Sequence, residues 1–317
     1  NCARRSSSSW RRNSIRAEFA GDSGTVIGWR QSRVESIELR GLRYSVRHWG
    51  EAEAPLVFFL HGWMDASATF QFVVDALARD WHVVAPDWRG YGASQWLSRP
   101  YWFADYYADL DELLRHYSPH RPARLVGHSM GANIAAIYAG SRPERVGQLA
   151  MLDFLGLKTP DPAAAPASLG KWLAGLEETP ELRLYRDRAA LARRLCFANP
   201  RLTPERAGFL AAHVGHVRAD GQVAMACDPW HKIAAPTPYR VDDALACWRA
   251  ITAPVLMLVA ERGFVRQRFG DDPAEYERRT ACFARLQVVT VPDAGHNLQH
   301  DQPERVAQAL EAFLSRD

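Results

Sequence analysis

The sequence predicts an α/β fold in which a mostly parallel, eight-stranded sheet is flanked by helices. Apolar runs of strand length alternate with segments whose apolar residues recur every three or four positions, which is typical of a parallel sheet wrapped by helices. The alternation stops between residues 156 and 241, where Pro-rich and Ala-rich pieces replace the strands. A third observation is a Gly-x-Ser-x-Gly motif at residues 127–131, between an apolar run and an alanine-rich helical pattern.

The apolar runs and the periodic segments give the expected elements of the core. The runs are bounded by turn-forming residues, as strands usually are. Strands are expected at residues 34–39, 42–48, 56–60, 82–85, 123–127, 146–152, 254–260 and 286–291. Helices are expected at residues 70–78, 103–117, 130–140 and 304–314.

The break in the alternation predicts an insertion. We expect residues 156–241 to form a helical lid, and residues 34–155 and 242–317 to form the core domain. The Pro-rich and Ala-rich stretch 159–166 predicts a hinge or entry loop. A lid over the site would set substrate choice. Within it, helical patterns lie at residues 167–178, 188–197 and 204–213.

The first 33 residues differ from the rest in composition. They contain a run of four serines and five arginines before the first acid, Glu18, and no apolar core segment. We expect residues 1–33 to be disordered. The same composition is found in organelle transit peptides, so targeting remains an alternative, whereas a secretory signal is disfavoured because no apolar h-region is present.

Composition limits the class of protein. Of the 317 residues 47% are hydrophobic and 24% are charged, which is typical of globular proteins and excludes fibrous and disordered classes. The net charge of +3 gives no reason to expect nucleic acid as a partner. The longest apolar runs are shorter than the roughly 18 to 20 residues of a membrane-spanning helix, so stable membrane insertion is not expected.

The five cysteines are widely spaced and form no C-x-x-C pair. The spacing predicts neither a disulfide framework nor a metal site, and a reducing, cytoplasmic location fits best. The sequence gives no indication of the oligomeric state.

The Gly-x-Ser-x-Gly motif predicts a catalytic serine. A serine exposed on a sharp strand-to-helix turn needs flanking glycines, because a Cβ at either position would collide with the neighbouring backbone. Ser129 is therefore the candidate nucleophile. Acyl transfer by serine also needs a base, and His296 follows the last expected strand and precedes the last helix.

The oxyanion of such a reaction needs hydrogen-bond donors. The backbone N–H of the residue after the nucleophile, Met130, is one candidate. The second is the backbone N–H of Trp63, in the loop 61–65 after an early strand, where Gly62 would allow the tight turn.

Four ordered motifs carry a family resemblance that extends over about residues 34–317. They are His61-Gly62-Trp63, the turn 87–94, the Gly-x-Ser-x-Gly motif and Gly295-His296-Asn297. In this order they resemble the α/β-hydrolase-fold serine hydrolases, in particular the lid-bearing esterase-like and lipase-like branch and the serine hydrolase-like proteins. The resemblance implies an α/β-hydrolase fold and a catalytic triad of Ser, His and an acidic residue. It also implies that the turn 87–94 has a structural role and takes no part in the chemistry.

The acid of the triad departs from the pattern of this family. In many relatives it follows the strand after the lid, but here Gly263 stands where it would be expected. The resemblance allows a relocated acid at the end of the strand before the lid, which is Asp153. Glu261 is the alternative acid, although it lies about two residues early. We favour Asp153 because the acid must reach the far imidazole nitrogen.

Several other side chains are candidates for the pocket lining. His128 precedes the nucleophile, and Phe154 follows the candidate acid. Trp172, Trp230 and His231 lie in the expected lid, where packing within the lid itself is the alternative role.

The sequence thus predicts a serine hydrolase that cleaves a carboxylic ester with an apolar part, with no cofactor and no metal. A carbon–carbon bond hydrolase, thioesterase, amidase or cofactor-free perhydrolase would use the same side chains and remains an alternative. An alternative of another class is a non-catalytic ligand receptor on the same fold, since no acid is present at Gly263.

Overall fold

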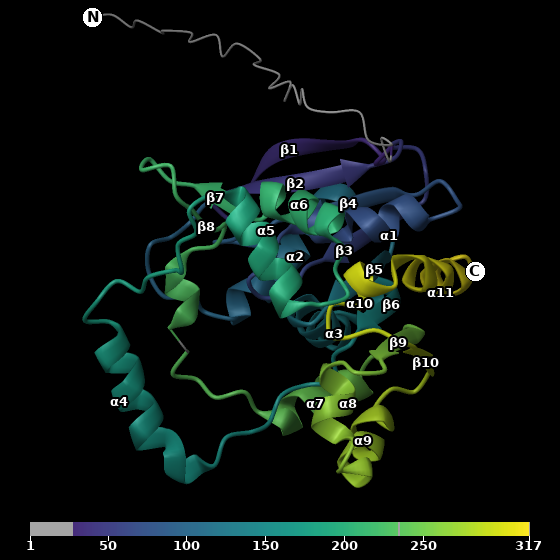
Figure 1. Cartoon of the computed structure of the whole chain (residues 1–317). Coiled ribbons are helices and arrows are strands. Elements are labelled where there is room, and N and C mark those ends of the chain that lie inside the picture. The colour runs from purple at the N-terminus through teal and green to yellow at the C-terminus, as the bar shows by residue number, and fades with distance from the viewer. Residues whose placement is uncertain (1–27, 234, 317) are drawn as a thin grey trace, which may run out of the picture.

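The computed structural model describes residues 28–233 and 235–316, and a sheet runs through its centre (Figure 1). The eight strands have the order β1-β2-β4-β3-β5-β6-β9-β10. β1 pairs antiparallel with β2 and β2 with β4, whereas the strands from β4 to β10 pair in parallel. The strands are β1 Ser32–Leu39, β2 Leu42–Trp49, β3 Leu56–Leu60, β4 His82–Pro86, β5 Ala123–His128, β6 Val146–Leu152, β9 Val255–Ala260 and β10 Leu286–Val291. All eight expected strands are present, and the predicted α/β architecture with a mostly parallel, eight-stranded sheet is confirmed.

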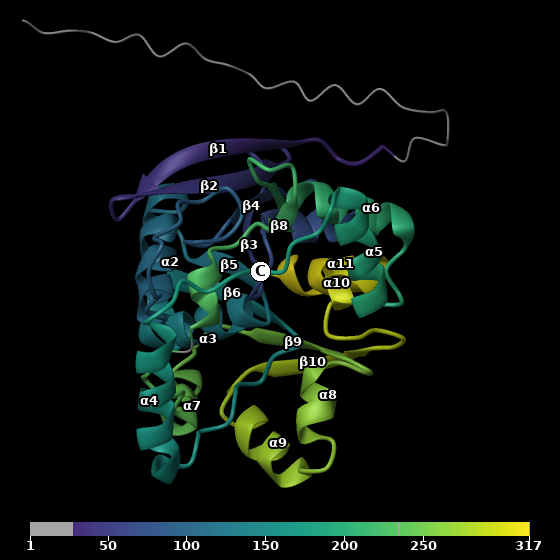
Figure 2. The same ribbon diagram turned by 60° about the vertical axis from the view of Figure 1, so that its left-hand side comes forward.

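The two faces of the sheet carry separate apolar cores. Successive side chains of a strand point to opposite faces. In β3, Phe58 and Leu60 pack in the core with helices α2 and α3, whereas Val57 and Phe59 pack in the core with α1 and α11. Figure 2 shows α2 and α3 on one side of the sheet and α11 on the other. These are the four expected helices: α1 Gln71–Ala76, α2 Ala104–Tyr117, α3 Met130–Ser141 and α11 Pro303–Leu314.

Four helices of the second half of the chain were not predicted. They are short, and two of them are only one or two turns long, so their apolar periodicity is too brief to be seen. The first of them packs closely on α3, because a Cβ at Gly140 would collide with the backbone of Cys247. The helices are α7 Val241–Arg249, α8 Phe264–Phe269, α9 Pro273–Thr280 and α10 Leu298–Asp301.

Between β6 and β9 the chain forms helices and a small hairpin. The helices are α4 Ala165–Gly175, α5 Arg188–Ala198 and α6 Pro204–His213, and the unpredicted hairpin pairs β7 Gly215–Val217 with β8 Val223–Met225. Leu202 and Leu210 pack against Phe72 of α1, so the pair α5 and α6 lies on the core. α4 has no buried residue and stands apart from the sheet in Figure 1. Its start at residue 165 and its end at residue 175 fall slightly earlier than expected.

The predicted boundary of the disordered extension, residue 33, lies too far along the chain. Residues 28–33 are in contact with the core, while residues 1–27 lie outside the described residues. The Trp29 ring lies 5.4 Å from the rings of Phe72 and Phe209, and the Arg30 backbone N–H donates to Asp75 at 2.7 Å. The partly buried Trp29 ring and the Arg30 hydrogen bond attach this segment to the core, and composition alone does not reveal these contacts.

Two further findings concern the described residues. None of their helices is both long and apolar enough to cross a membrane. Cys196, Cys227, Cys247 and Cys282 are free thiols, with Cys227 and Cys282 buried.

Candidate active site

Ser129 lies on a sharp turn between the end of β5 and the start of α3. Its φ of 51° is in the left-handed region, which is rare for a residue other than glycine and stores backbone strain. Glycines allow this turn: a Cβ at Gly131 would collide with the Leu60 carbonyl, and a Cβ at Gly127 would collide with the Ala132 backbone. The local geometry is that of the strand–turn–helix predicted for the motif.

The side chains of Ser129, His296 and Asp153 form one hydrogen-bonded chain. His296 Nε2 lies 3.0 Å from Ser129 Oγ, and His296 Nδ1 lies 2.8 Å from Asp153 Oδ2. An ionised carboxylate only accepts hydrogen bonds, so the proton of a neutral imidazole lies on Nδ1. Nε2 is then free to accept the proton of the serine hydroxyl.

The carboxylate of Asp153 is fully buried and is held from three directions. Apart from His296, it accepts hydrogen bonds from the Phe264 backbone N–H at 2.6 Å and the Ala260 backbone N–H at 3.2 Å. These two donors fix the position of the carboxylate beside the imidazole. The His296 side chain, in contrast, is 38% exposed and can be reached from outside.

The structure explains why no acid stands at position 263. A Cβ at Gly263 would fall on the Asp153 carboxylate, so the two positions compete for the same space. Asp153, the favoured candidate, is the carboxylate beside His296. Glu261, the alternative, is exposed and accepts a hydrogen bond from the Asp293 backbone N–H at 2.9 Å instead.

The loop 61–65 passes directly beside the serine. A Cβ at Gly62 would lie 3.3 Å from the Ser129 Cβ and 3.0 Å from His128 Nδ1, which shows how closely the loop approaches. Neither the Trp63 nor the Met130 backbone N–H donates to an acceptor within the described part of the chain. Both predicted donors are therefore unpaired next to the nucleophile, and the Trp63 side chain points outward and is 55% exposed.

Buried histidines fix the two loops that flank the serine. Burial lowers the pKa of His61 to about 4, so its neutral ring holds fixed bonds: Nδ1 lies 2.7 Å from the Gly62 carbonyl, and Nε2 accepts from the Trp88 N–H at 2.9 Å. Burial also lowers the pKa of His128 well below its usual value, and His128 Nε2 lies 2.8 Å from the His296 carbonyl. His128 is thus a support for the histidine loop, a role that the sequence did not indicate.

A small cavity opens beside Ser129. Its volume is about 150 Å³, and its polar side carries Asp65, whose pKa burial raises to about 7. His128 lines this cavity, as predicted. The apolar side comes from the inserted segment and is formed by Leu195, Leu210, Val214 and Met225.

The other aromatic candidates do not line this cavity. Phe154 is buried and stacks on Phe264, with ring centroids 6.0 Å apart. Trp172 lies on α4, away from the core. Trp230 and His231 belong to a short turn that packs elsewhere, with the His231 ring stacked between Tyr91 and Tyr101 at 4.0 and 3.8 Å.

The structure does not bring these residues to the cavity beside Ser129, and their prediction as pocket lining was based on residue type alone. The aliphatic side chains at helical spacing on α5 and α6 would have predicted the cavity wall better. The face of a helix that packs on the core also borders the cavity. Among the described residues, no group of three or more His, Cys, Asp or Glu side chains is arranged to hold a metal ion.

The comparisons with known proteins agree with this architecture. The family model for the alpha/beta hydrolase fold matches residues 55–303, and the chain belongs to this family. The serine hydrolase-like protein of Danio rerio is 27% identical over 288 residues, covering 87% of this chain and 85% of the relative. The 2-(acetamidomethylene)succinate hydrolase of Mesorhizobium japonicum (strain LMG 29417 / CECT 9101 / MAFF 303099) is 26% identical over 280 residues, covering 88% and 94%.

A solved structure shows the same fold. The thioesterase domain from the curacin biosynthetic pathway superposes with a TM-score of 0.78 at 24% identity, covering 90% of this chain and 100% of that domain. The family match and the named relatives together indicate that this protein is a hydrolase.

Proposed function

We propose that the protein is a serine hydrolase that cleaves a carboxylic ester through an acyl-enzyme on Ser129. The observation that carries this proposal is the hydrogen-bonded chain from Ser129 through His296 to the buried Asp153. Ser129 Oγ attacks the ester carbonyl carbon while His296 Nε2 takes its proton. His296 then returns that proton to the leaving alcohol as the tetrahedral intermediate collapses, and Asp153 stabilises the imidazolium in between.

Water completes the cycle. His296 takes a proton from water, the resulting hydroxide attacks the acyl carbon, and the carboxylic acid leaves as the proton returns to Ser129. We assign the stabilisation of the tetrahedral oxyanion to the unpaired N–H groups of Trp63 and Met130. The close approach of the loop 61–65 to Ser129 supports this role.

The cavity beside Ser129 supports a small apolar group on the substrate. A cavity of about 150 Å³ holds a group of about the size of benzene. Because its apolar side comes from residues 195–225, we also propose that the inserted segment, residues 156–241, is the lid that selects the substrate.

The first experiment is labelling of the intact protein with a fluorophosphonate, followed by mass spectrometry. An activated serine reacts, so we expect one adduct on the wild type and none on Ser129→Ala. Ser141→Ala, an exposed serine at the other end of α3, is the matched control and should label like the wild type. Folded wild-type protein that does not label would favour a non-catalytic receptor.

A panel of p-nitrophenyl esters tests the substrate class. We expect acetyl and butyryl esters to be cleaved faster than the palmitoyl ester, because the cavity is small. Met225→Ala enlarges the cavity and should shift the preference toward longer chains by about tenfold. Failure of every chain length, with intact labelling, would reject the ester and leave the triad assignment in place.

A further inference from the structure

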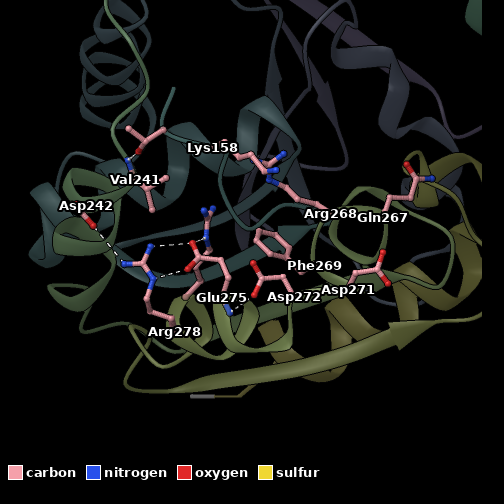
Figure 3. Close-up of a pocket in the computed structure, with 12 residues that line it drawn as sticks. Lys158, Val241, Asp242, Gln267, Arg268, Phe269, Asp271, Asp272, Glu275 and Arg278 are labelled. Atoms are coloured by element: carbon pink, nitrogen blue, oxygen red, sulfur yellow. Dashed lines mark hydrogen bonds and ion pairs between the residues drawn. The ribbon is translucent and has the colours of Figure 1, made fainter. Parts of the chain in front are cut away.

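A second cavity lies away from Ser129 and shares no lining residue with the first. Its volume is about 660 Å³. Figure 3 shows its lining, which comes from the segment after β6, from the start of α7, and from α8 and α9. Most of the lining side chains are charged, in contrast to the apolar wall beside Ser129.

Arg268 of α8 lines this cavity, and one edge of its guanidinium is unpaired. Its Nε and Nη2 are buried, and neither has a hydrogen-bond partner among the described residues. These two N–H groups lie side by side along one edge of the planar guanidinium, and their spacing matches two oxygens of a carboxylate or phosphate. Buried donors without an acceptor are costly, so an empty pair of this kind is unusual.

Four acids line the cavity, namely Asp242, Asp271, Asp272 and Glu275, and three of them have other partners. Glu275 pairs with Arg278 at 2.6 Å and with Arg279 at 2.7 Å, and Asp242 lies 3.5 Å from Arg278. Asp272 accepts a hydrogen bond from the Glu275 backbone N–H at 3.1 Å and caps α9. None of the four carboxylates forms an ion pair with Arg268 among the described residues.

Three further cations, Lys158, Arg278 and Arg279, line the cavity together with Arg268. Arg279 is buried and donates to the carbonyls of Leu155 and Leu157, both at 2.9 Å. Burial and the charge of Arg279 lower the pKa of Arg268, and the negative charge of Glu275 opposes this shift only in part. In Figure 3, Lys158 and Arg268 extend toward one another, and Lys158 has no ion pair within residues 28–233 and 235–316.

We propose that this cavity binds an oxyanion, namely the carboxylate or phosphate group of a small molecule, on the side-on edge of Arg268 with Lys158 as the second cation. Both nitrogen atoms are closed to solvent in this structure, and binding therefore requires the Arg268 side chain to rotate until this edge faces the cavity. The site is separate from Ser129 and does not depend on the reaction performed there.

Titration of the full chain with sodium phosphate and, separately, with sodium acetate tests the proposal. Sodium chloride keeps the ionic strength constant, and the melting temperature and the heat of binding are measured. We expect saturable binding of at least one of the two anions, which also identifies the preferred group. Arg268→Gln should weaken this binding by about tenfold or more, because it removes hydrogen bonds to a charged group.

Two controls separate this site from general salt effects. Arg266→Gln removes an exposed arginine of the same helix that does not line the cavity, and it should bind like the wild type. Ser129→Ala should also bind like the wild type. If Arg268→Gln does not fold, Arg268→Lys keeps the charge without the side-on pair and is expected to show the same weakening. Absence of saturable binding in the wild type, or equal binding by all variants, would overturn the proposal.

Discussion

Two buried aspartates lie next to histidines, one in the core and one in the inserted segment, and their surroundings differ. Asp153 accepts a hydrogen bond from the imidazole of His296. Asp228 instead accepts from the Tyr101 hydroxyl and the Ser98 backbone N–H, both at 2.8 Å. Its other oxygen accepts from the backbone N–H of Trp230 at 3.1 Å.

The two histidines differ accordingly. His296 presents Nε2 to a serine and is partly exposed, whereas His231 is stacked between two tyrosine rings. His231 Nε2 is buried and has no hydrogen-bond partner among the described residues. An Asp and a His close together are therefore not enough for proton transfer. The carboxylate must hold the ring, and the far nitrogen must reach both a nucleophile and the substrate.

The same substitution at both aspartates should separate these roles. Asp153→Asn is expected to lower kcat about 10⁴-fold, because an amide no longer orients the imidazole and stabilises its positive charge. Asp228→Asn should leave kcat near that of the wild type but lower the free energy of unfolding by about 1 to 3 kcal/mol, since buried donors lose an acceptor. Ester turnover and urea unfolding of both variants test this, and a large loss of kcat in Asp228→Asn would contradict the distinction.

Gly263→Ala tests how strictly Asp153 is positioned. The added Cβ collides with the carboxylate, so we expect Asp153 to shift and kcat to fall about a hundredfold, as for a misplacement of about 1 Å. Gly170→Ala, on α4, is the control for an added methyl, because no atom lies within 4 Å of the new Cβ, and it should not affect kcat. Unchanged turnover in Gly263→Ala would show that the carboxylate has room to move.

The buried His231 should make stability depend on pH. Burial lowers its pKa from 6.5 to about 4, so between these values the unfolded chain binds a proton that the folded protein does not. The free energy of unfolding therefore decreases as the pH falls from 6.5 toward 4, by up to about 3 kcal/mol from this residue. His231→Phe keeps the stacking and should make this part of the profile less steep, while the buried His61 and His128 still contribute to it. Parallel wild-type and variant profiles would contradict this.

Glu261→Gln should have the smallest effect. Its carboxylate accepts one backbone hydrogen bond at the surface and does not contact His296. We expect kcat within about twofold of the wild type and a change in stability within about 0.5 kcal/mol. A loss of kcat comparable to that of Asp153→Asn would show that Glu261, and not Asp153, is the acid of the triad.

Much of the core could be predicted from the sequence, because its strands are apolar runs bounded by turns and its long helices are periodic. The positions of Ser129, His296 and Asp153 follow from motifs at the ends of these strands. The cavity wall could not be predicted, since Leu195 and Leu210 look like any apolar residues of a helix. The unpaired edge of the Arg268 guanidinium could not be predicted either. It results from the packing of four separate segments, and no local sequence pattern indicates it.

The steric conflict between Asp153 and a side chain at position 263 links these two positions of the chain. A Cβ at position 263 and the carboxylate of Asp153 would occupy the same volume. A carboxylate at position 153 is therefore compatible with glycine at position 263, and a larger residue there requires Asp153 to move. The effects of substitutions at the two positions should for this reason not be additive.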